Sequence, residues 1–305
     1  MRVEFIEQRL SDDLVTRIYV VEVDGELLIV DAGVERQGDL ELLDRIVERL
    51  GGWRRVAGVF LTHGHIDHVG LAEAVRTRFG VPVYLHERDY WMVEDYGRYI
   101  DGMLGFIRMV VNWGFPRQYL VYESLQWSRR GRLVSEVETW SEEKTVIGGA
   151  LALHTPGHTM GSSCLVVGDT VFAGDTVARG TPLTFDVESH IKSLRMLEGA
   201  SSIYTAHQGL LPGSSIPRLI EAFKKKLKNI VAATGSSIGF YELFTRLYGD
   251  PSRLGSRNIF AARNLYTYIE FLVRKGVLEE TIVSGKPLWR RVVSESEALR
   301  LVESL

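Results

Sequence analysis

The nine residues THGHIDHVG, 62–70, place four potential metal ligands within six positions: His63, His65, Asp67 and His68. The preceding run VAGVFL, 56–61, is apolar, which predicts a buried strand that ends at the edge of a sheet. Residues two apart in an extended chain point the same way, and the apolar residues of 68–78 recur at helical spacing. A strand followed by a helix can therefore present the four side chains to two adjacent metal ions.

The chemistry of these side chains limits the kind of site. Imidazole and carboxylate groups suit zinc, iron or manganese, and the motif lacks the cysteines that close a structural zinc site. The alternative is a helix start that carries incidental histidines. The chain has eight histidines and three of them fall within six residues, so we favour a metal site.

Four motifs elsewhere in the chain complete the ligand order of a known family. They are LLIVDAG, HTPGHTMGS, GDTVFAGDT and YTAHQG, which contain, in order, Asp31, His158, Asp175 and His207. Together with HxHxDH at 63–68, these motifs resemble the metallo-β-lactamase superfamily over residues 31–209. Leu71 and Gln208 depart from glycines that are common in the family, and neither departure removes a ligand.

The resemblance implies an α+β fold, the αββα sandwich of this superfamily, and a dinuclear metal centre. One metal ion would be held by His63, His65 and His158. The second would be held by Asp67, His68 and His207, and Asp175 would bridge the two ions. Zinc is the expected metal, with iron or manganese as alternatives.

This centre predicts a metal-dependent hydrolase. Two divalent ions about 3.5–4 Å apart can hold a hydroxide between them and polarise a carbonyl or phosphoryl oxygen. We expect the bridging hydroxide to attack a small thioester, ester or lactone, as in the similar glyoxalase II enzymes, with Asp67 handling a proton. Ser162 departs from the glyoxalase II pattern, which commonly has histidine there.

Two other functions stay open. One is a nuclease or other phosphodiesterase that acts on RNA or DNA through a basic C-terminal segment. The other is a binding module without catalysis, and the complete ligand set argues against it. A nuclease of the kind that processes messenger RNA would need a large inserted domain that this sequence lacks.

Composition places the chain among soluble globular proteins. It has 305 residues, 45% hydrophobic and 25% charged, enough for one large or two ordinary domains. The opening residues lack the apolar stretch of a signal peptide, and the sequence has no run of about 18 apolar residues. We expect a cytoplasmic protein that does not bind membranes. Cys164 is alone in the sequence, which excludes an internal disulfide, and its setting predicts a buried strand position.

Residues 3–30 alternate apolar runs with turn signals, and Asp24-Gly25 is the dipeptide of a tight hairpin turn. We expect antiparallel strands, the second of which ends at Asp31. This carboxylate would orient the motif's backbone or a ligand histidine, and the alternative is a cap for the amphipathic helix predicted over 38–50. Strand, helix and strand then place the site at the carboxyl ends of the strands.

Residues 87–138 resemble the family least and are predicted to form a helical insert. One helix is expected to stop at Gly114-Phe115-Pro116, and a second is expected over 118–129. The insert contains three of the six tryptophans of the chain, Trp91, Trp113 and Trp127. These rings either cap the metal centre or attach the insert to the core.

Residues 144–175 again predict strands, with a hairpin turn at Gly168-Asp169. The loop 177–185 must pass near the metals, so Arg179 and Phe185 are candidate substrate contacts. The remaining histidines, His86, His154 and His190, are expected in the core. For His154, support of the metal centre is the alternative.

The C-terminal segment differs in charge. Residues 1–216 carry 21 basic and 30 acidic side chains, a net of −9, whereas 217–291 carry 14 and 6, a net of +8. This basic segment either binds nucleic acid or packs on the sandwich or in a homodimer, and we favour packing. Its cluster of lysines is interpreted as the solvated face of a helix: Lys224, Lys225, Lys226 and Lys228.

Helical spacing in this segment predicts helices over 217–233, 241–248 and 257–275. A hairpin that turns at Gly285 follows them. Three helices and a two-stranded wing resemble a winged helix. We therefore expect a catalytic domain over 1–213 and a winged-helix-like domain over 214–305.

Overall fold

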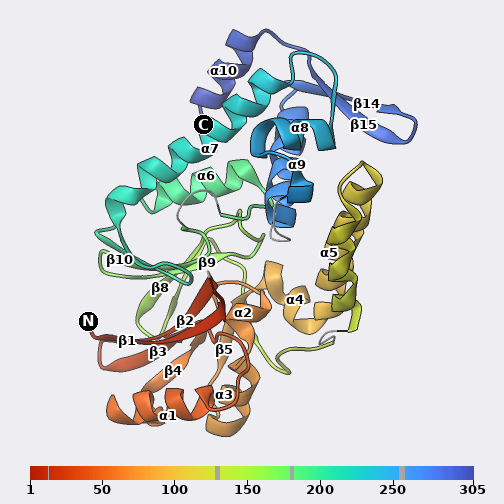
Figure 1. Ribbon diagram of the computed structural model, residues 1–305. Coiled ribbons are helices and arrows are strands. Elements are labelled where there is room, and N and C mark those ends of the chain that lie inside the picture. The colour runs from red at the N-terminus through yellow and green to blue at the C-terminus, as the bar shows by residue number, and fades with distance from the viewer. Residues whose placement is uncertain (13, 128–130, 179–181, 254–257) are drawn as a thin grey trace.

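The computed structural model describes residues 1–12, 14–127, 131–178, 182–253 and 258–305, with side chains described outside 123–127. Its first twelve strands form two sheets that lie face to face between helices (Figure 1). The first sheet runs β1-β2-β3-β4-β5-β6, with β1 (Val3–Ser11), β2 (Leu14–Val23), β3 (Glu26–Val30), β4 (Val56–Phe60), β5 (Val83–His86) and β6 (Glu138–Trp140). The second runs β12-β11-β10-β9-β8-β7, with β7 (Lys144–Ile147), β8 (Ala150–His154), β9 (Ser163–Val167), β10 (Thr170–Gly174), β11 (Ser202–Thr205) and β12 (Gly209–Pro212).

Aromatic side chains fill the space between the sheets. The ring centroid of Tyr19 on β2 lies 5.6 Å from that of Phe172 on β10 and 5.4 Å from that of Tyr204 on β11. Leu28 and Phe60 of the first sheet are buried in the same cluster. Burial of this apolar surface stabilises the face-to-face packing, and the arrangement agrees with the sandwich predicted from the sequence.

The two hairpin turns predicted within the sandwich are present. Asp24 and Gly25 connect β2 to β3 with φ of 47° and 88°, the left-handed pair that a tight turn of this type requires. Gly168 has φ of 61° between the antiparallel strands β9 and β10. Cys164 lies on β9 and is fully buried, as predicted.

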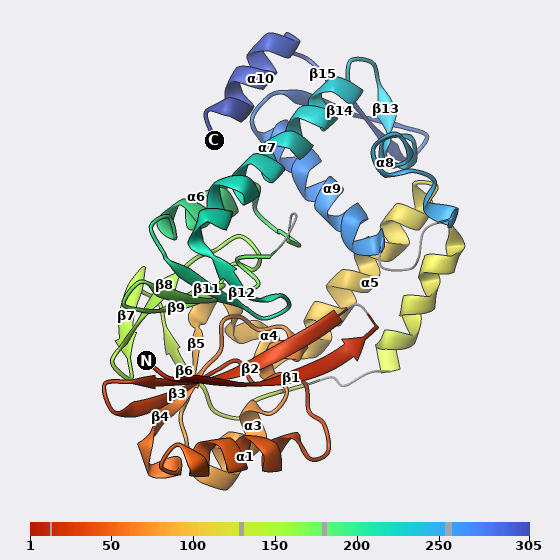
Figure 2. The same ribbon diagram turned by 60° about the vertical axis from the view of Figure 1, so that its left-hand side comes forward.

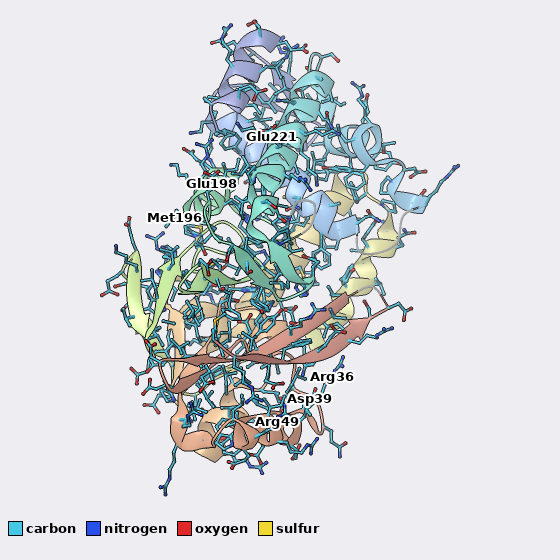
Figure 3. All side chains as sticks on the ribbon, turned by 90° about the vertical axis from the view of Figure 1, so that its left-hand side faces the viewer. Arg36, Asp39, Arg49, Met196, Glu198 and Glu221 are labelled. Atoms are coloured by element: carbon cyan, nitrogen blue, oxygen red, sulfur yellow. The ribbon has the colours of Figure 1, made fainter. Side chains whose placement is uncertain are left out.

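Helices cover the outer faces of the two sheets (Figure 2). α1 (Asp39–Arg49), which follows the prediction for 38–50, and α3 (Ala72–Phe79) cover the first sheet, and α6 (Val187–Met196) covers the second. The buried positions of α1 are Leu43, Ile46 and Val47, which share one face of a helix. Figure 3 shows the labelled Asp39 and Arg49, the two ends of α1, beside the first sheet.

The single helix predicted over 68–78 is wrong, because the chain breaks it into α2 (Ile66–Val69) and α3. The backbone N–H of Gly70 donates to Gly33 O, at 2.7 Å, and that of Leu71 donates to Ala32 O, at 3.0 Å. A Cβ on Gly70 would lie 2.3 Å from the backbone nitrogen of Glu35. The break therefore lets the segment after β3 pack closely against the metal-binding turn.

The insert is helical, as predicted, although its second part is not an α-helix. It contains η2 (Glu87–Asp89), α4 (Tyr90–Glu94), α5 (Tyr96–Asn112) and the 3-10 segment η3 (Arg117–Trp127). Trp113 packs on the C-terminal segment, with ring centroids 5.6 Å from Phe240 and 6.0 Å from Trp289. Trp113 therefore attaches the insert, whereas the side chain of Trp127 lies outside the described residues.

The C-terminal segment folds into helices and a small sheet (Figure 1). Its elements are α7 (Ile216–Ala233), β13 (Ile238–Gly239), α8 (Phe240–Tyr248), α9 (Asn258–Arg274), β14 (Leu278–Val283), β15 (Lys286–Arg291) and α10 (Glu295–Glu303). The sheet order is β13-β15-β14, and short 3-10 turns complete the chain at η1 (Trp53–Arg55), η4 (Gly213–Ser215) and η5 (Pro251–Arg253). The predicted helices and hairpin are present, and α10 and β13 were not predicted. Among the described residues, no helix combines the length and apolar character that crossing a membrane requires.

The interpretation of the lysine cluster as a solvated face is wrong for two of its members, Lys224 and Lys226. Lys224 is 7% exposed and its ammonium donates to Glu303 O of α10 at 2.8 Å. Lys228 forms an ion pair with the Glu303 carboxylate, and the ammonium of Lys226 lies 5.8 Å from the ring centroid of Tyr248. Lys225 is exposed and the side chain of Lys228 is 33% exposed, whereas α8 and α10 cover Lys226 and Lys224.

Candidate metal centre

Strand ends from both sheets deliver the predicted metal ligands to one place. His63 follows β4, and Asp31 follows the parallel neighbour β3. In the second sheet, Asp175 and His207 follow the parallel strands β10 and β11, and His158 follows β8. Parallel strands end at the same edge, so residues far apart in the sequence converge here.

Three imidazole nitrogens form the first donor set. His65 Nδ1 lies 2.9 Å from His63 Nε2 and 3.1 Å from His158 Nε2. Tetrahedral coordination at about 2.0–2.1 Å separates ligand atoms by about 3.3 Å. All three side chains are buried, with exposures of 8% or less. The spacing therefore suits a single ion between the three rings.

The second donor set combines a carboxylate with two imidazoles. Asp67 Oδ2 lies 3.7 Å from His68 Nε2 and 3.7 Å from His207 Nε2. Asp175 stands between the sets, because its Oδ2 lies 3.1 Å from His207 Nε2 and 3.6 Å from His158 Nε2. The structure thus brings together all seven predicted ligands in overlapping groups that are able to hold metal ions.

Hydrogen bonds on the far side of three rings, those of His68, His158 and His207, set which nitrogen faces the centre. The Nδ1–H of His68 donates to Asp31 Oδ2 at 2.8 Å, and that of His158 donates to Leu183 O at 2.7 Å. His207 makes the same kind of bond to Val15 O. These tautomers leave the Nε2 lone pairs free to bind a metal. His68 Nε2 and Asp175 Oδ1 are buried without a hydrogen-bond partner among the described residues, which fits a cation between them.

The protein environment separates the pKa values of the ligands. Burial and the neighbouring imidazoles hold the pKa values of His63 and His65 well below their usual range, so both rings are neutral. Burial also acts on His68, but Asp31, Asp67 and Asp175 outweigh it and raise its pKa to about 10. For His207, Asp175 likewise outweighs burial, and the pKa rises to about 9. Protonated His68 and His207 thus balance the negative charge of the nearby carboxylates, which a bound divalent cation would otherwise balance.

Asp31 has the orienting role predicted for it, and the alternative of a helix cap is wrong. Its Oδ1 accepts from the backbone N–H of Thr62 at 2.8 Å while Oδ2 fixes His68. Asp31 is 2% exposed and has φ of 60°, a conformation that non-glycine residues seldom adopt. The short segment after β3 therefore holds both the start of the motif and one of its histidines.

An apolar cavity of about 370 Å³ adjoins the centre. Its walls come from α4 and α5, from the segment that contains Leu183 and Phe185, and from α9. The ring centroid of Tyr99 in this cavity lies 5.0 Å from that of His65, and Leu183 accepts the hydrogen bond of His158. Trp91 and Phe185 line the cavity, so Trp91 lies where a cap would be, and a substrate contact by Phe185 stays a prediction. Arg179 lies outside the described residues.

Comparisons with known proteins agree with this geometry. The family profile described as the metallo-beta-lactamase superfamily matches residues 11–214. The chain belongs to this superfamily. An uncharacterized protein of Mycobacterium leprae is 33% identical over 165 residues, 51% of this chain and 64% of that protein. The match thus spans less than two thirds of that relative.

Two similarities cover more of the chain. The probable metallo-hydrolase YflN of Bacillus subtilis is 25% identical over 246 residues, 71% of this chain and 86% of that protein. The crystal structure of the metallo-beta-lactamase family protein TTHA1429 from Thermus thermophilus covers 95% of this chain and 98% of its own, with 19% identity and a TM-score of 0.71. That likeness shows a shared fold, which extends into the C-terminal segment. The comparisons support a metal-dependent hydrolase.

Sequence reasoning missed one buried carboxylate beside the superfamily motif. Asp89 accepts from the backbone N–H groups of Gly64 and Gly161, at 3.1 and 2.8 Å, and from the hydroxyl of Thr159 at 2.6 Å. It therefore joins the turn 63–68 to the loop that carries His158. Its position shortly after β5, a parallel neighbour of β4, was the available signal.

The other histidines lie outside the ligand groups, as predicted. His86 and His154 stack on each other with ring centroids 3.8 Å apart, and His154 Nε2 bonds to Met160 O. His190 on α6 is fully buried and bonds through Nε2 to Thr176 O. These contacts give all three histidines structural roles.

Proposed function

We propose that the protein is a dinuclear metal-dependent hydrolase of a small thioester, ester or lactone, similar to glyoxalase II. The observation that carries this proposal is the carboxylate of Asp175, which lies between two donor sets, within 3.6 Å of His158 and 3.1 Å of His207. In this proposal His63, His65 and His158 hold one ion. Asp67, His68 and His207 hold the other, and Asp175 bridges them.

Two divalent ions bound there lower the pKa of a water molecule and polarise the carbonyl of a substrate. The chain supplies what those ions need. Asp31 keeps His68 in the tautomer that presents Nε2, and the carbonyl of Leu183 does the same for His158. Asp67 has the most exposed side chain of its donor set, at 25%, so we assign it the transfer of a proton toward solvent.

The nuclease alternative receives less support. In a winged helix that binds DNA, the third helix enters the major groove. Here α9 instead packs on the catalytic part, where Asn264 accepts from the backbone N–H of Thr184 at 2.8 Å and donates to Pro182 O at 3.0 Å. The order of helices and strands in residues 214–305 supports a winged-helix-like domain, and we propose that it serves as a wall of the active site rather than as a nucleic-acid reader.

Metal analysis tests the proposal. Protein loaded with zinc, iron or manganese should bind about two ions and hydrolyse thioesters, esters or lactones when loaded with the right metal. His158→Ala should lose mainly the first ion, His207→Ala the second, and Asp175→Ala both. The matched control is His154→Ala, which lies outside the donor sets and should keep both ions. Full metal content and activity in Asp175→Ala would rule out the proposed centre.

A further inference from the structure

The cavity beside the metal centre has a composition that selects for apolar groups. Aliphatic and aromatic residues dominate its walls, among them Met103, Phe106 and Ile259. None of the described residues that line it is a carboxylate, a lysine or an amide. A wall of this kind gains most from displacing water with hydrocarbon.

The two arginine side chains that line the cavity, Arg98 and Arg263, lie over aromatic rings of the same cavity. The guanidinium of Arg263 on α9 lies 4.9 Å from the ring centroid of Phe185 and 5.2 Å from that of Phe106. Arg98 lies 5.4 Å from the ring of Trp91. Cation–π contacts of this kind compensate a partly desolvated guanidinium. Arg263 thus joins α5, the segment after Asp175 and α9 into one wall.

The cavity borders the proposed catalytic centre, because two of its lining residues contact metal ligands. Tyr99 lies against His65, and the carbonyl of Leu183 holds His158. A substrate whose scissile carbonyl reaches the donor sets would therefore extend its chain between α5 and α9. Neither wall alone encloses that chain, since α5 belongs to the insert and α9 to the C-terminal segment.

We infer that this cavity binds a straight apolar chain on the acyl side of the substrate, so that the protein prefers thioesters and esters with a medium-length acyl chain to the corresponding acetyl compounds. The inference rests on the proposed hydrolase for the reaction itself. The C-terminal segment is then part of the substrate site, and α9 sets the chain length that the site accepts.

A pair of glycines on α5 makes the inference testable without removing any buried contact. A Cβ on Gly102 would meet nothing within 4 Å, and Gly102 lines the cavity. Gly105, one turn further along, is equally unobstructed but does not line the cavity. Leucine at either position raises helix propensity, so Gly102→Leu and Gly105→Leu should both fold. Only Gly102→Leu places a side chain in the space proposed for the substrate.

The binding arm uses the metal-loaded protein and neutral straight-chain alcohols, from butanol to octanol, in titration calorimetry. The dissociation constant should fall about fourfold per methylene, with a negative heat-capacity change. Gly102→Leu should weaken octanol binding by about tenfold. Gly105→Leu should bind octanol as wild type does. Equal octanol affinity in the two variants and wild type would overturn the inference.

The kinetic arm compares acetyl, hexanoyl and octanoyl thioesters, together with a hexanoyl analogue that ends in a carboxylate. kcat/KM should rise with chain length in wild type and Gly105→Leu, and Gly102→Leu should lose most of that rise. Preference for the carboxylate-ended chain, or hydrolysis without chain-length dependence, contradicts the inference and leaves the hydrolase standing. Alcohol binding as expected with no hydrolysis of any substrate supports the chain site and removes the proposed hydrolase.

Discussion

Asp31 shows how one carboxylate outside the donor sets can control them. Its oxygen accepts the Nδ1–H of His68, and an amide nitrogen in that place cannot accept. We therefore expect Asp31→Asn to lower the affinity for the second metal ion by about 10- to 100-fold, measured by competition with a chelator. Asp89→Asn is the comparison, because it also alters buried hydrogen bonds, to Gly64, Gly161 and Thr159, but none of these is to a ligand imidazole. Wild-type affinity for both ions in Asp31→Asn would contradict this role.

His190 gives the fold a pH dependence of known sign. Burial lowers its pKa from 6.5 to about 4 in the folded protein. Between these values the unfolded chain binds a proton that the folded chain does not, so stability is full above pH 6.5 and falls toward pH 4. The loss should reach about 3 kcal/mol. Glutamine does not titrate in this range. The difference in unfolding free energy between His190→Gln and wild type should therefore change by about this amount as the pH falls from 6.5 to 4. A difference that stays constant from pH 7 to about 4 would contradict it.

For single residues, the type and order of the metal ligands were predictable because the ligands lie in short motifs after strands. His63 was predicted from the HxHxDH motif itself, whereas Asp175 and His207 were assigned through the resemblance of their motifs to the superfamily. Asp89 and Arg263 were not predictable in this way, because their partners come from distant segments. The hydroxyl of Thr159 donates to Asp89, and the guanidinium of Arg263 lies over the ring of Phe106 in the insert. Their roles depend on tertiary packing, which no local pattern encodes.

Two tryptophans of the helical insert have different roles. Trp91 lines the cavity, whereas Trp113 packs on Phe240 and Trp289 of the C-terminal segment. Trp113→Ala should lower the free energy of unfolding by about 3 kcal/mol and leave KM unchanged. Trp91→Ala should change KM or substrate preference more than stability. Kinetics and denaturant unfolding of the two variants give the comparison, and the reverse pattern would contradict the division.

Element boundaries were predicted best where a local signal ends the element. The turns at Asp24-Gly25 and Gly168 and the helix over 38–50 carry such signals. The break at Gly70 does not, because its cause is the close approach of residues 33–35 to that glycine. η3 is a 3-10 segment despite its helical spacing, and the structure gives no physical account of that difference.

For the whole molecule, the distribution of basic side chains argues against a nucleic-acid surface on α7. Lys224 and Lys228 already bond to Glu303, which leaves Arg218 and Lys225 as the exposed basic side chains of α7. A surface that neutralised phosphates would show log affinity falling with log salt by about 0.7 per phosphate on a single strand. We expect weak RNA binding with a shallow slope, measured by titration at several salt concentrations. A steep slope that Lys225→Glu reduces would favour the nuclease.

Two substitutions on α7 test whether the C-terminal segment and the sandwich fold as one unit. Phe223 of α7 is fully buried, with its ring centroid 5.0 Å from that of His190 on α6, whereas Lys225 two residues later is exposed. Phe223→Asp buries an unpaired carboxylate between the two parts, which should separate them or unfold the chain and cause aggregation. Lys225→Asp should leave the protein monodisperse in light scattering. Cleavage after residue 213 that releases a stable, active sandwich would instead mean that the two parts are independent.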